Sequence, residues 1–292
     1  MCDNDSIEDM MDYVRQAKEM SRRQFGALSL GMGLVMSLPR GADAADVVEQ
    51  DLDIKTPDGV ADSYFVHPAT GKHPAVLMWT DIMGLRPAFK MMAKRLAESG
   101  YSVLVPNPFY RIRKGPAMDP GKTMEDPATR TALMGMMGSL TADVQTADAK
   151  NFIAWLDTQK SVDTKRKIGT AGYCMGGPLV MHTVAARPDR LGAGATFHGA
   201  NLANDKPDSP HLLIPAMKAQ FLIAIAESDD KREPNSKTIL REAFDKAKLP
   251  AEIEVYAGTA HGWCPPDSAV YNQEQAEKAW SRMLALFKKA LV

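Results

Sequence analysis

Short runs of apolar residues recur along the chain from residue 74 onward. A run without polar alternation is typical of a strand that is buried on both faces of a parallel sheet. Such strands are predicted at residues 74–79, 101–105, 167–171, 193–198 and 219–226, and a further strand is predicted at residues 251–256.

Stretches with apolar residues at helical spacing alternate with these strands. In residues 87–99, Phe89, Met92 and Leu96 share one helical face, and Gly100 is a good C-terminal cap. Before them, two strands at residues 47–55 and 60–67 flank a Pro-Asp-Gly turn and predict a β-hairpin. Further helices are predicted at residues 142–158, 177–186, 236–248 and 274–291.

This alternation predicts an α/β fold with a mainly parallel, doubly wound sheet and helices on both faces. Residues 107–141 have no clear period and several Pro and Gly residues. We expect there a loop-rich insertion with short helical pieces over the carboxyl edge of the sheet, where such folds bind ligands. No repeat or linker divides residues 45–292, so one domain is expected.

Composition and charge narrow the function classes. The 292 residues are 45% hydrophobic and 24% charged, with a net charge of -1. This is an ordinary globular composition, and it gives no electrostatic case for binding nucleic acid. No run of 18 apolar residues occurs, so no stable membrane insertion of the mature protein is expected. We expect a monomer or a small homo-oligomer.

The N-terminus has the pattern of a targeting signal. Residues 21–25 read Ser-Arg-Arg-Gln-Phe, a weakly hydrophobic run follows at residues 26–38, and residues 42–44 form an Ala-x-Ala site. The paired arginines resemble a twin-arginine signal. Residues 1–44 are therefore expected to direct export by the twin-arginine machinery to the periplasm. The alternatives are an attached amphipathic helix and an uncleaved anchor.

The strongest chemical signal is Gly-Tyr-Cys-Met-Gly at residues 172–176, between a predicted strand and a predicted helix. Strand, Gly-x-nucleophile-x-Gly turn and helix together are typical of the nucleophile elbow of the α/β-hydrolase fold, with Cys174 in place of serine. The glycines are needed because side chains there would collide with neighbouring backbone. The helix dipole favours a thiolate. The alternative is a structural cysteine in an ordinary turn.

A cysteine nucleophile needs a base, and the base needs an orienting acid. This fold supplies them in the chain order nucleophile, acid, histidine. We favour His261, in a loop after the last strand, over His198 at the end of an earlier strand. The acid is expected after the strand at residues 219–226, where we favour Asp229 and keep Asp230 as the alternative.

The loop after the strand at residues 74–79 is predicted to complete the site. It supplies one oxyanion-hole N–H, from Ile82, and the residue after the nucleophile, Met175, supplies the other. Asp81 stands in this loop between apolar neighbours, and its carboxylate is expected to face the thiol and modulate its charge. The alternative for Asp81 is a turn cap.

These motifs resemble the dienelactone hydrolase family, whose best-known members are carboxymethylenebutenolidases. The resemblance runs from about residue 55 to the C-terminus. It implies an ester or lactone hydrolase in which Cys174 attacks the carbonyl, His261 transfers the proton, Asp229 orients the imidazole and a thioester is hydrolysed. The motifs that carry it are Thr80-Asp81-Ile82-Met83-Gly84-Leu85, Gly172-Tyr173-Cys174-Met175-Gly176-Gly177, Ala226-Glu227-Ser228-Asp229-Asp230 and His261-Gly262-Trp263.

Two departures from the family pattern concern the substrate. Dienelactone-specific members carry Glu where this chain has Asp81, and an arginine where it has Pro265. A different ester or lactone is therefore at least as good a candidate substrate as dienelactone. Residues expected near the substrate are Arg111, Arg130, His198 and Trp263.

Other function classes have weaker support. A noncatalytic or redox-sensitive ligand-binding protein on the same fold, with Cys174 and Cys264 paired, is the main alternative. A papain-type peptidase is not indicated, because that class has its cysteine near the mature N-terminus. No cofactor is expected, and the histidines and acids lack the spacing of a metal site.

Overall fold

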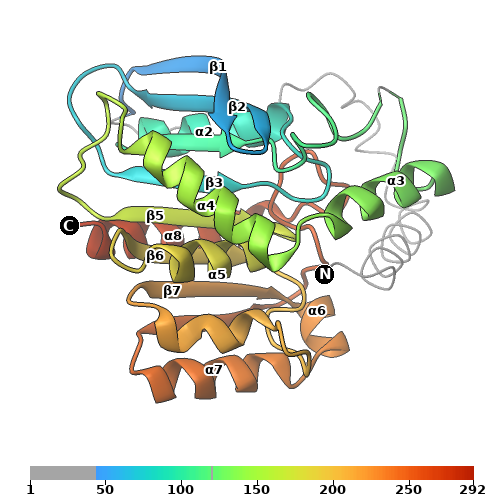
Figure 1. Cartoon of the computed structure of the whole chain (residues 1–292). Coiled ribbons are helices and arrows are strands. Elements are labelled where there is room, and N and C mark those ends of the chain that lie inside the picture. The colour runs from blue at the N-terminus through green and yellow to red at the C-terminus, as the bar shows by residue number, and fades with distance from the viewer. Residues whose placement is uncertain (1–43, 120) are drawn as a thin grey trace.

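The computed structural model describes residues 44–119 and 121–292. They form an eight-stranded sheet in the order β1-β2-β4-β3-β5-β6-β7-β8 (Figure 1). The hairpin β1–β2 and the pair β2–β4 are antiparallel, and all other neighbours are parallel. The strands are β1 (Val47–Thr56), β2 (Gly59–Pro68), β3 (Ala75–Trp79), β4 (Ser102–Pro106), β5 (Ile168–Tyr173), β6 (Leu191–Phe197), β7 (Gln220–Ala226) and β8 (Ala251–Tyr256).

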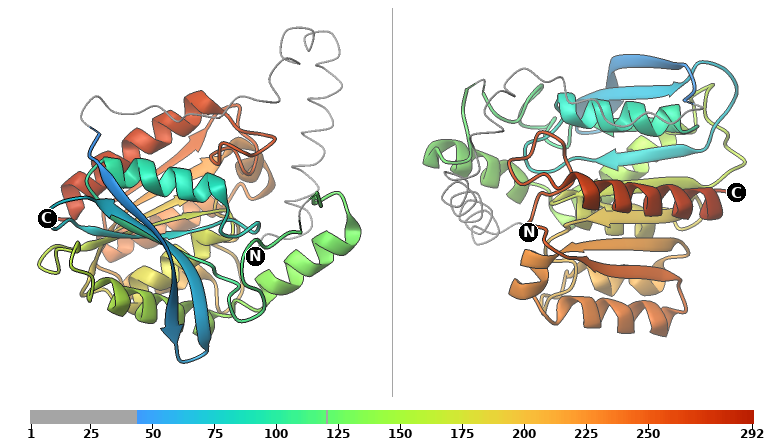
Figure 2. Two further views of the ribbon diagram at one scale, coloured as in Figure 1. Left: turned by 90° about the horizontal axis from the view of Figure 1, so that it is seen from above. Right: turned by 180° about the vertical axis from the view of Figure 1, so that it is seen from behind.

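Helices cover both faces of the sheet, as the two opposite views show (Figures 1 and 2). One face carries α2 (Pro87–Glu98) and α8 (Gln273–Ala290); the other carries α4 (Ala142–Leu156), α5 (Gly176–Ala186) and α7 (Ser236–Ala247). Each layer encloses its own hydrophobic cluster. The predicted doubly wound α/β sheet is confirmed, and the arrangement is that of the α/β-hydrolase fold.

Three helices differ from the sequence prediction. The insertion contains a regular three-turn helix, α3 (Pro127–Gly138), where only short pieces were expected. The N-terminus of α3 is stabilised because the Asp126 side chain accepts a hydrogen bond from the Ala128 amide. Pro127 occupies the first helical position, where proline is favoured. A short helix, α6 (Glu227–Arg232), follows β7 directly, and a 3₁₀ helix, η2 (Pro210–Ala216), precedes β7.

Parallel strands bring their carboxyl ends to one edge of the sheet. The loops after β3, β5, β6, β7 and β8 therefore converge there, and these loops carry the predicted site residues. The predicted export signal spans residues 1–44, and all of it except residue 44 lies outside the described residues. In the described part of the chain, no helix is both long enough and apolar enough to cross a membrane.

Candidate active site

Cys174 stands in a tight turn directly after β5. Its φ of 54° lies in the left-handed region, which a residue with a side chain adopts at a cost of about 1 kcal/mol or more. A Cβ on Gly172 would lie 2.1 Å from the carbonyl oxygen of Gly176, and one on Gly176 would lie 2.9 Å from the carbonyl oxygens of Trp79 and Thr80. Both glycines are therefore required by close backbone approach.

The turn is fixed by its own backbone bonds. The amide of Cys174 donates to the carbonyl of Phe197 at 3.0 Å, and its carbonyl accepts from Gly177 at 2.9 Å. The thiol is buried at the N-terminus of α5, where the helix dipole favours negative charge. These contacts hold the sulfur at the edge of the sheet where the loops converge.

His261 joins Cys174 to an acid. Its Nδ1 lies 3.0 Å and 2.9 Å from the two carboxylate oxygens of Asp229, and its ring also hydrogen-bonds the Cys174 sulfur. Ser228 accepts a hydrogen bond from the His261 amide at 2.9 Å, which fixes the backbone of the histidine as well. Cysteine, histidine and acid thus form one connected chain of contacts.

The protonation of His261 follows from this environment. Burial on its own would lower the pKa of His261, but the negative charge of Asp229, with Cys174, raises that pKa well above its ordinary value. The surroundings therefore favour a protonated imidazole. A protonated imidazole next to a cysteine favours the thiolate form, which is the nucleophilic form of that side chain.

Asp229 and Asp230 have different partners. The Asp229 carboxylate contacts His261 and accepts from Arg232 at 3.1 Å. Asp230 instead pairs with Lys237, whose Nζ lies 2.7 Å from each of its oxygens. The structure therefore brings Asp229, and not Asp230, onto the histidine.

The two predicted oxyanion-hole amides come from different loops: Ile82 stands in the loop after β3, and Met175 follows Cys174 in the turn after β5. Ile82 and Met175 are both buried. For their amide N–H groups, the structure shows no hydrogen-bond acceptor among residues 44–119 and 121–292. Backbone amides without an acceptor are suited to receive the oxygen of a tetrahedral intermediate, and the oxyanion-hole role of Ile82 and Met175 stays a prediction.

Asp81 was predicted to face the thiol, but in the structure its carboxylate is bound by Arg86. Its two oxygens accept from Nη1 and Nη2 of Arg86 at 2.7 Å and 2.9 Å. One of them also accepts from the Met83 amide at 2.9 Å, as in a turn cap. These contacts favour the turn-cap alternative, and a thiol-modulating role for Asp81 stays a prediction.

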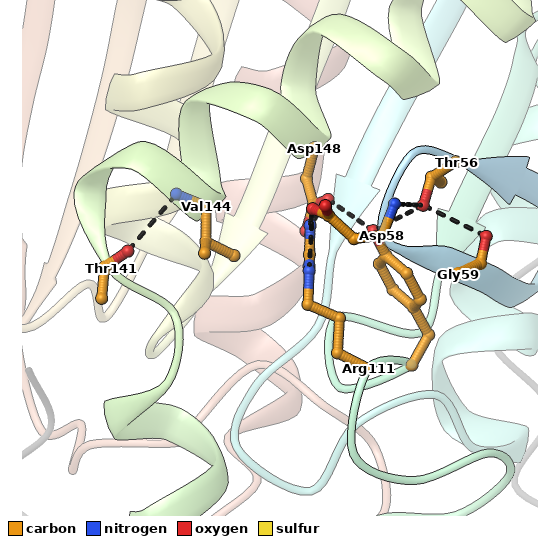
Figure 3. A network of polar contacts seen from close by, with 8 residues as sticks. Thr56, Asp58, Gly59, Arg111, Thr141, Val144 and Asp148 are labelled. Atoms are coloured by element: carbon orange, nitrogen blue, oxygen red, sulfur yellow. Dashed lines mark hydrogen bonds and ion pairs between the residues drawn. The ribbon is translucent and has the colours of Figure 1, made fainter.

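Arg111 was predicted to contact substrate, but its guanidinium is held by two carboxylates (Figure 3). Nη1 and Nη2 donate to Asp148 at 2.8 Å and 2.6 Å, and Nη2 donates to Asp58 at 2.7 Å. This arginine therefore ties the β1–β2 hairpin to α4. Arg130 lies on α3, where its Nε donates to the carbonyl of Met124 at 3.2 Å.

His198 and Trp263 were predicted to line the substrate pocket, and both are fully buried instead. His198 packs edge-to-face on His261 with ring centroids 5.1 Å apart, and Trp263 stacks on Tyr256. Burial lowers the pKa of His198 well below its usual value, and His261 lowers it further. His198 is thus a neutral ring that packs against His261.

The second cysteine lies in a different layer. Cys264 and Cys174 are not joined in a disulfide, and they belong to the two separate hydrophobic clusters. Burial raises the pKa of the Cys264 thiol well above its usual value, so this thiol stays protonated. Among the residues that the structure describes, no cluster of three or more His, Cys, Asp or Glu side chains is placed to hold a metal ion.

A cavity of about 210 Å³ opens beside Met175. It lies between α4, α5 and the segment that precedes η2, with Leu140, Leu179 and His182 among its lining residues. On its wall, the Gln145 Oε1 is buried and has no hydrogen-bond partner among the described residues. The cavity is therefore lined by apolar side chains and by a buried hydrogen-bond acceptor, Gln145 Oε1, close to the turn that carries Cys174.

Sequence reasoning missed Arg86 and Asp267. Nε and Nη2 of Arg86 donate to Asp267 at 2.6 Å and 2.9 Å, on the edge of the guanidinium next to the one that holds Asp81. No local signal predicts this contact, because the two residues are 181 positions apart.

Comparison with known proteins agrees with this fold. The profile of the Dienelactone hydrolase family matches residues 61–291. The carboxymethylenebutenolidase of Rhodococcus opacus is 27% identical over 232 residues, which cover 76% of this chain and 83% of that protein.

Solved structures show the same architecture. A candidate dienelactone hydrolase from Klebsiella pneumoniae superposes with a TM-score of 0.71 at 22% identity, covering 84% of this chain and 99% of that one. The dienelactone hydrolase-like promiscuous phosphotriesterase P91, from metagenomic libraries, gives a TM-score of 0.68 at 18% identity, with the same coverage. The family profile spans most of the chain, and the chain therefore belongs to the dienelactone hydrolase family.

Proposed function

We propose that this protein hydrolyses a carboxylic ester or lactone through Cys174, His261 and Asp229, with a thioester acyl-enzyme. One observation carries the proposal: the His261 ring bonds Asp229 through Nδ1 and also hydrogen-bonds the sulfur of a cysteine that stands in a glycine-flanked turn. This is the geometry of an activated nucleophile, its base and the group that orients the base.

Each residue has a defined step. The Cys174 sulfur attacks the carbonyl carbon and His261 holds the thiol proton, while the amides of Ile82 and Met175 stabilise the oxyanion. Collapse of the tetrahedral intermediate breaks the C–O bond, and His261 gives its proton to the leaving alcohol oxygen. Water then attacks the thioester, His261 takes its proton, and the acid departs as the thiol is restored.

We further propose that the preferred substrate lacks a carboxylate. Of the arginines near the loops, Arg86 and Arg111 are each already bound to two aspartates, and position 265 is proline. Releasing either arginine to bind an anionic substrate would leave one buried carboxylate, Asp81 or Asp148, without its ion pair. A neutral ester or lactone avoids that cost.

The experiment is a hydrolysis screen of short esters and lactones, including one carboxylated lactone and its methyl ester, with Cys174→Ala and Cys174→Ser. We expect kcat/KM to fall by roughly 10⁴-fold or more in Cys174→Ala. The control is Cys264→Ala, which removes the thiol in the other layer and should change kcat by less than about twofold. Full hydrolysis by Cys174→Ala, or none by the wild type on any substrate, would overturn the proposal.

We also propose that the protein works in the periplasm after export by the twin-arginine route. The support is the sequence of residues 21–44, which lie almost wholly outside the described residues. The thiol at Cys174 would then act in an oxidising compartment.

A further inference from the structure

Arg86 had no predicted role, yet all three of its guanidinium nitrogens donate hydrogen bonds to carboxylates. Its side chain is 11% exposed. One edge of the guanidinium, Nη1 and Nη2, holds both oxygens of Asp81, and the adjacent edge, Nε and Nη2, holds both oxygens of Asp267. The group also lies over the Phe89 ring, 4.9 Å from its centroid, which fixes its plane. Two carboxylates are thereby held at set positions around one rigid plane.

The two carboxylates belong to different walls of the candidate site. Asp81 shapes the turn that carries Ile82, since its carbonyl accepts from Gly84 at 3.0 Å and its side chain accepts from Met83. Asp267 lies in the segment between His261 and α8. Arg86 itself immediately precedes α2, so it is anchored to a long helix. The guanidinium therefore spans the oxyanion loop and the segment that follows the base.

We propose that Arg86 is a positioning residue that fixes the Ile82 amide relative to Cys174 and His261. The inference rests on the proposed hydrolytic function, and it concerns the oxyanion amide rather than the thiol. Burial alone would lower the pKa of Arg86, but Asp81 and Asp267 raise it, so the guanidinium stays charged. A shift of the reacting groups by about 1 Å costs on the order of 100-fold in rate.

The test separates two reactions of the same sulfur. Acylation by a p-nitrophenyl ester develops an oxyanion and needs the Ile82 amide, whereas alkylation by iodoacetamide needs only the thiolate. In Arg86→Met we expect the single-turnover acylation rate to fall by on the order of 100-fold. The alkylation rate of Cys174, followed by peptide mass in the full chain, should change by less than about threefold.

Two further variants keep the test informative if Arg86→Met does not fold. Asp267→Asn leaves the Asp81 contact intact and should slow acylation about tenfold. Arg86→Lys keeps the charge but loses the planar fork, so its acylation rate should lie between those of Arg86→Met and the wild type.

The matched control is Arg190→Met. Arg190 also makes a two-bond contact with an aspartate, Asp157, at 3.2 Å and 2.6 Å, and its side chain is 14% exposed. It precedes β6 at the opposite edge of the sheet, so its loss should lower stability but leave acylation within about twofold.

Equal falls of acylation and alkylation in the Arg86 variants, or acylation as fast as in Arg190→Met, would overturn the inference. A wild type that neither acylates nor hydrolyses any ester would instead overturn the proposed function.

Discussion

Asp229 and Asp230 are adjacent in sequence, but only one of them reaches the imidazole. The reason is their place on the short helix α6, which directs the Asp229 carboxylate toward His261 and the Asp230 carboxylate toward Lys237. The amide side chain of asparagine matches either aspartate in shape, so replacing each in turn isolates the charge.

We expect Asp229→Asn to lower kcat by about 10³- to 10⁴-fold, because the imidazole loses the group that sets its tautomer and stabilises its positive charge. Asp230→Asn should keep kcat within about twofold and cost less than about 1 kcal/mol of stability, since its partner Lys237 is partly exposed. Steady-state ester hydrolysis checks both, and similar activities for the two variants would reject Asp229 as the acid.

The raised pKa of His261 also predicts a pH dependence of stability. A group whose pKa is higher in the folded state stabilises the protein fully below its unfolded pKa, about 6.5 for histidine, and loses this effect as pH rises through the folded pKa. The measurement compares Cys174→Ala with Cys174→Ala/His261→Gln, so that the thiol does not titrate.

The difference in free energy of unfolding between these two variants should be largest near about pH 6 and should shrink at higher pH, by at most about 1.4 kcal/mol per pH unit. Urea melts between acidic and alkaline pH give this curve. A difference that grows with pH would mean that His261 is not held as an imidazolium by Asp229.

At the scale of elements, the strand–turn–helix unit β5–α5 depends on the absence of side chains. A methyl group on Gly172 would lie 2.1 Å from the Gly176 oxygen, and backbone cannot move aside easily. We expect Gly172→Ala to destabilise the protein by about 3 kcal/mol or more.

Gly135→Ala is the control for that substitution. Gly135 lies inside α3, is exposed, and has open space where a Cβ would be. Alanine there should stabilise the protein by about 0.5–1 kcal/mol, since it restricts the unfolded chain and favours helix. Urea midpoints at constant m-value test the pair, and equal effects of the two substitutions would contradict this account of the turn.

The elements that were predicted well are those marked by a local pattern of apolar residues in the sequence. The buried strands β3 to β7 are apolar on both faces, so their continuous runs mark them within a residue or two. The helix α3 was not predicted as one element because its buried face comprises only Leu133, Met136 and Met137, and two glycines weaken its propensity. The six-residue α6 is instead held by contacts of Glu227 and Ser228 with Thr259, 31 to 32 positions away.

The same distinction holds for the site. The proximity of Cys174, Asp229 and His261 could be predicted because the topology fixes which loop follows which strand. The pairing of Arg86 with Asp267 and of Arg111 with its two aspartates could not, because pairing between charged side chains 37 to 181 positions apart leaves no periodic trace. This is why Arg111 was assigned to the substrate, although two aspartates hold it.

At the scale of the whole molecule, the proposed destination depends on the leader. Replacing Arg22 and Arg23 together by lysine keeps the charge but removes the arginine pair that the export receptor reads. We expect the full-length chain to accumulate in the cytoplasmic fraction, measured by fractionation and immunoblot. Unchanged periplasmic recovery of the double variant would reject the twin-arginine route.

The contact between Arg86 and Asp267 has a consequence for the timing of synthesis. At roughly 5 to 20 residues per second, a ribosome adds Asp267 about 10 to 40 s after Arg86. His261 likewise emerges 87 residues after Cys174 (261 − 174). A nascent chain therefore carries the Cys174 sulfur for seconds before His261 and Asp267 have been added, and the proposed site can assemble only after both are present.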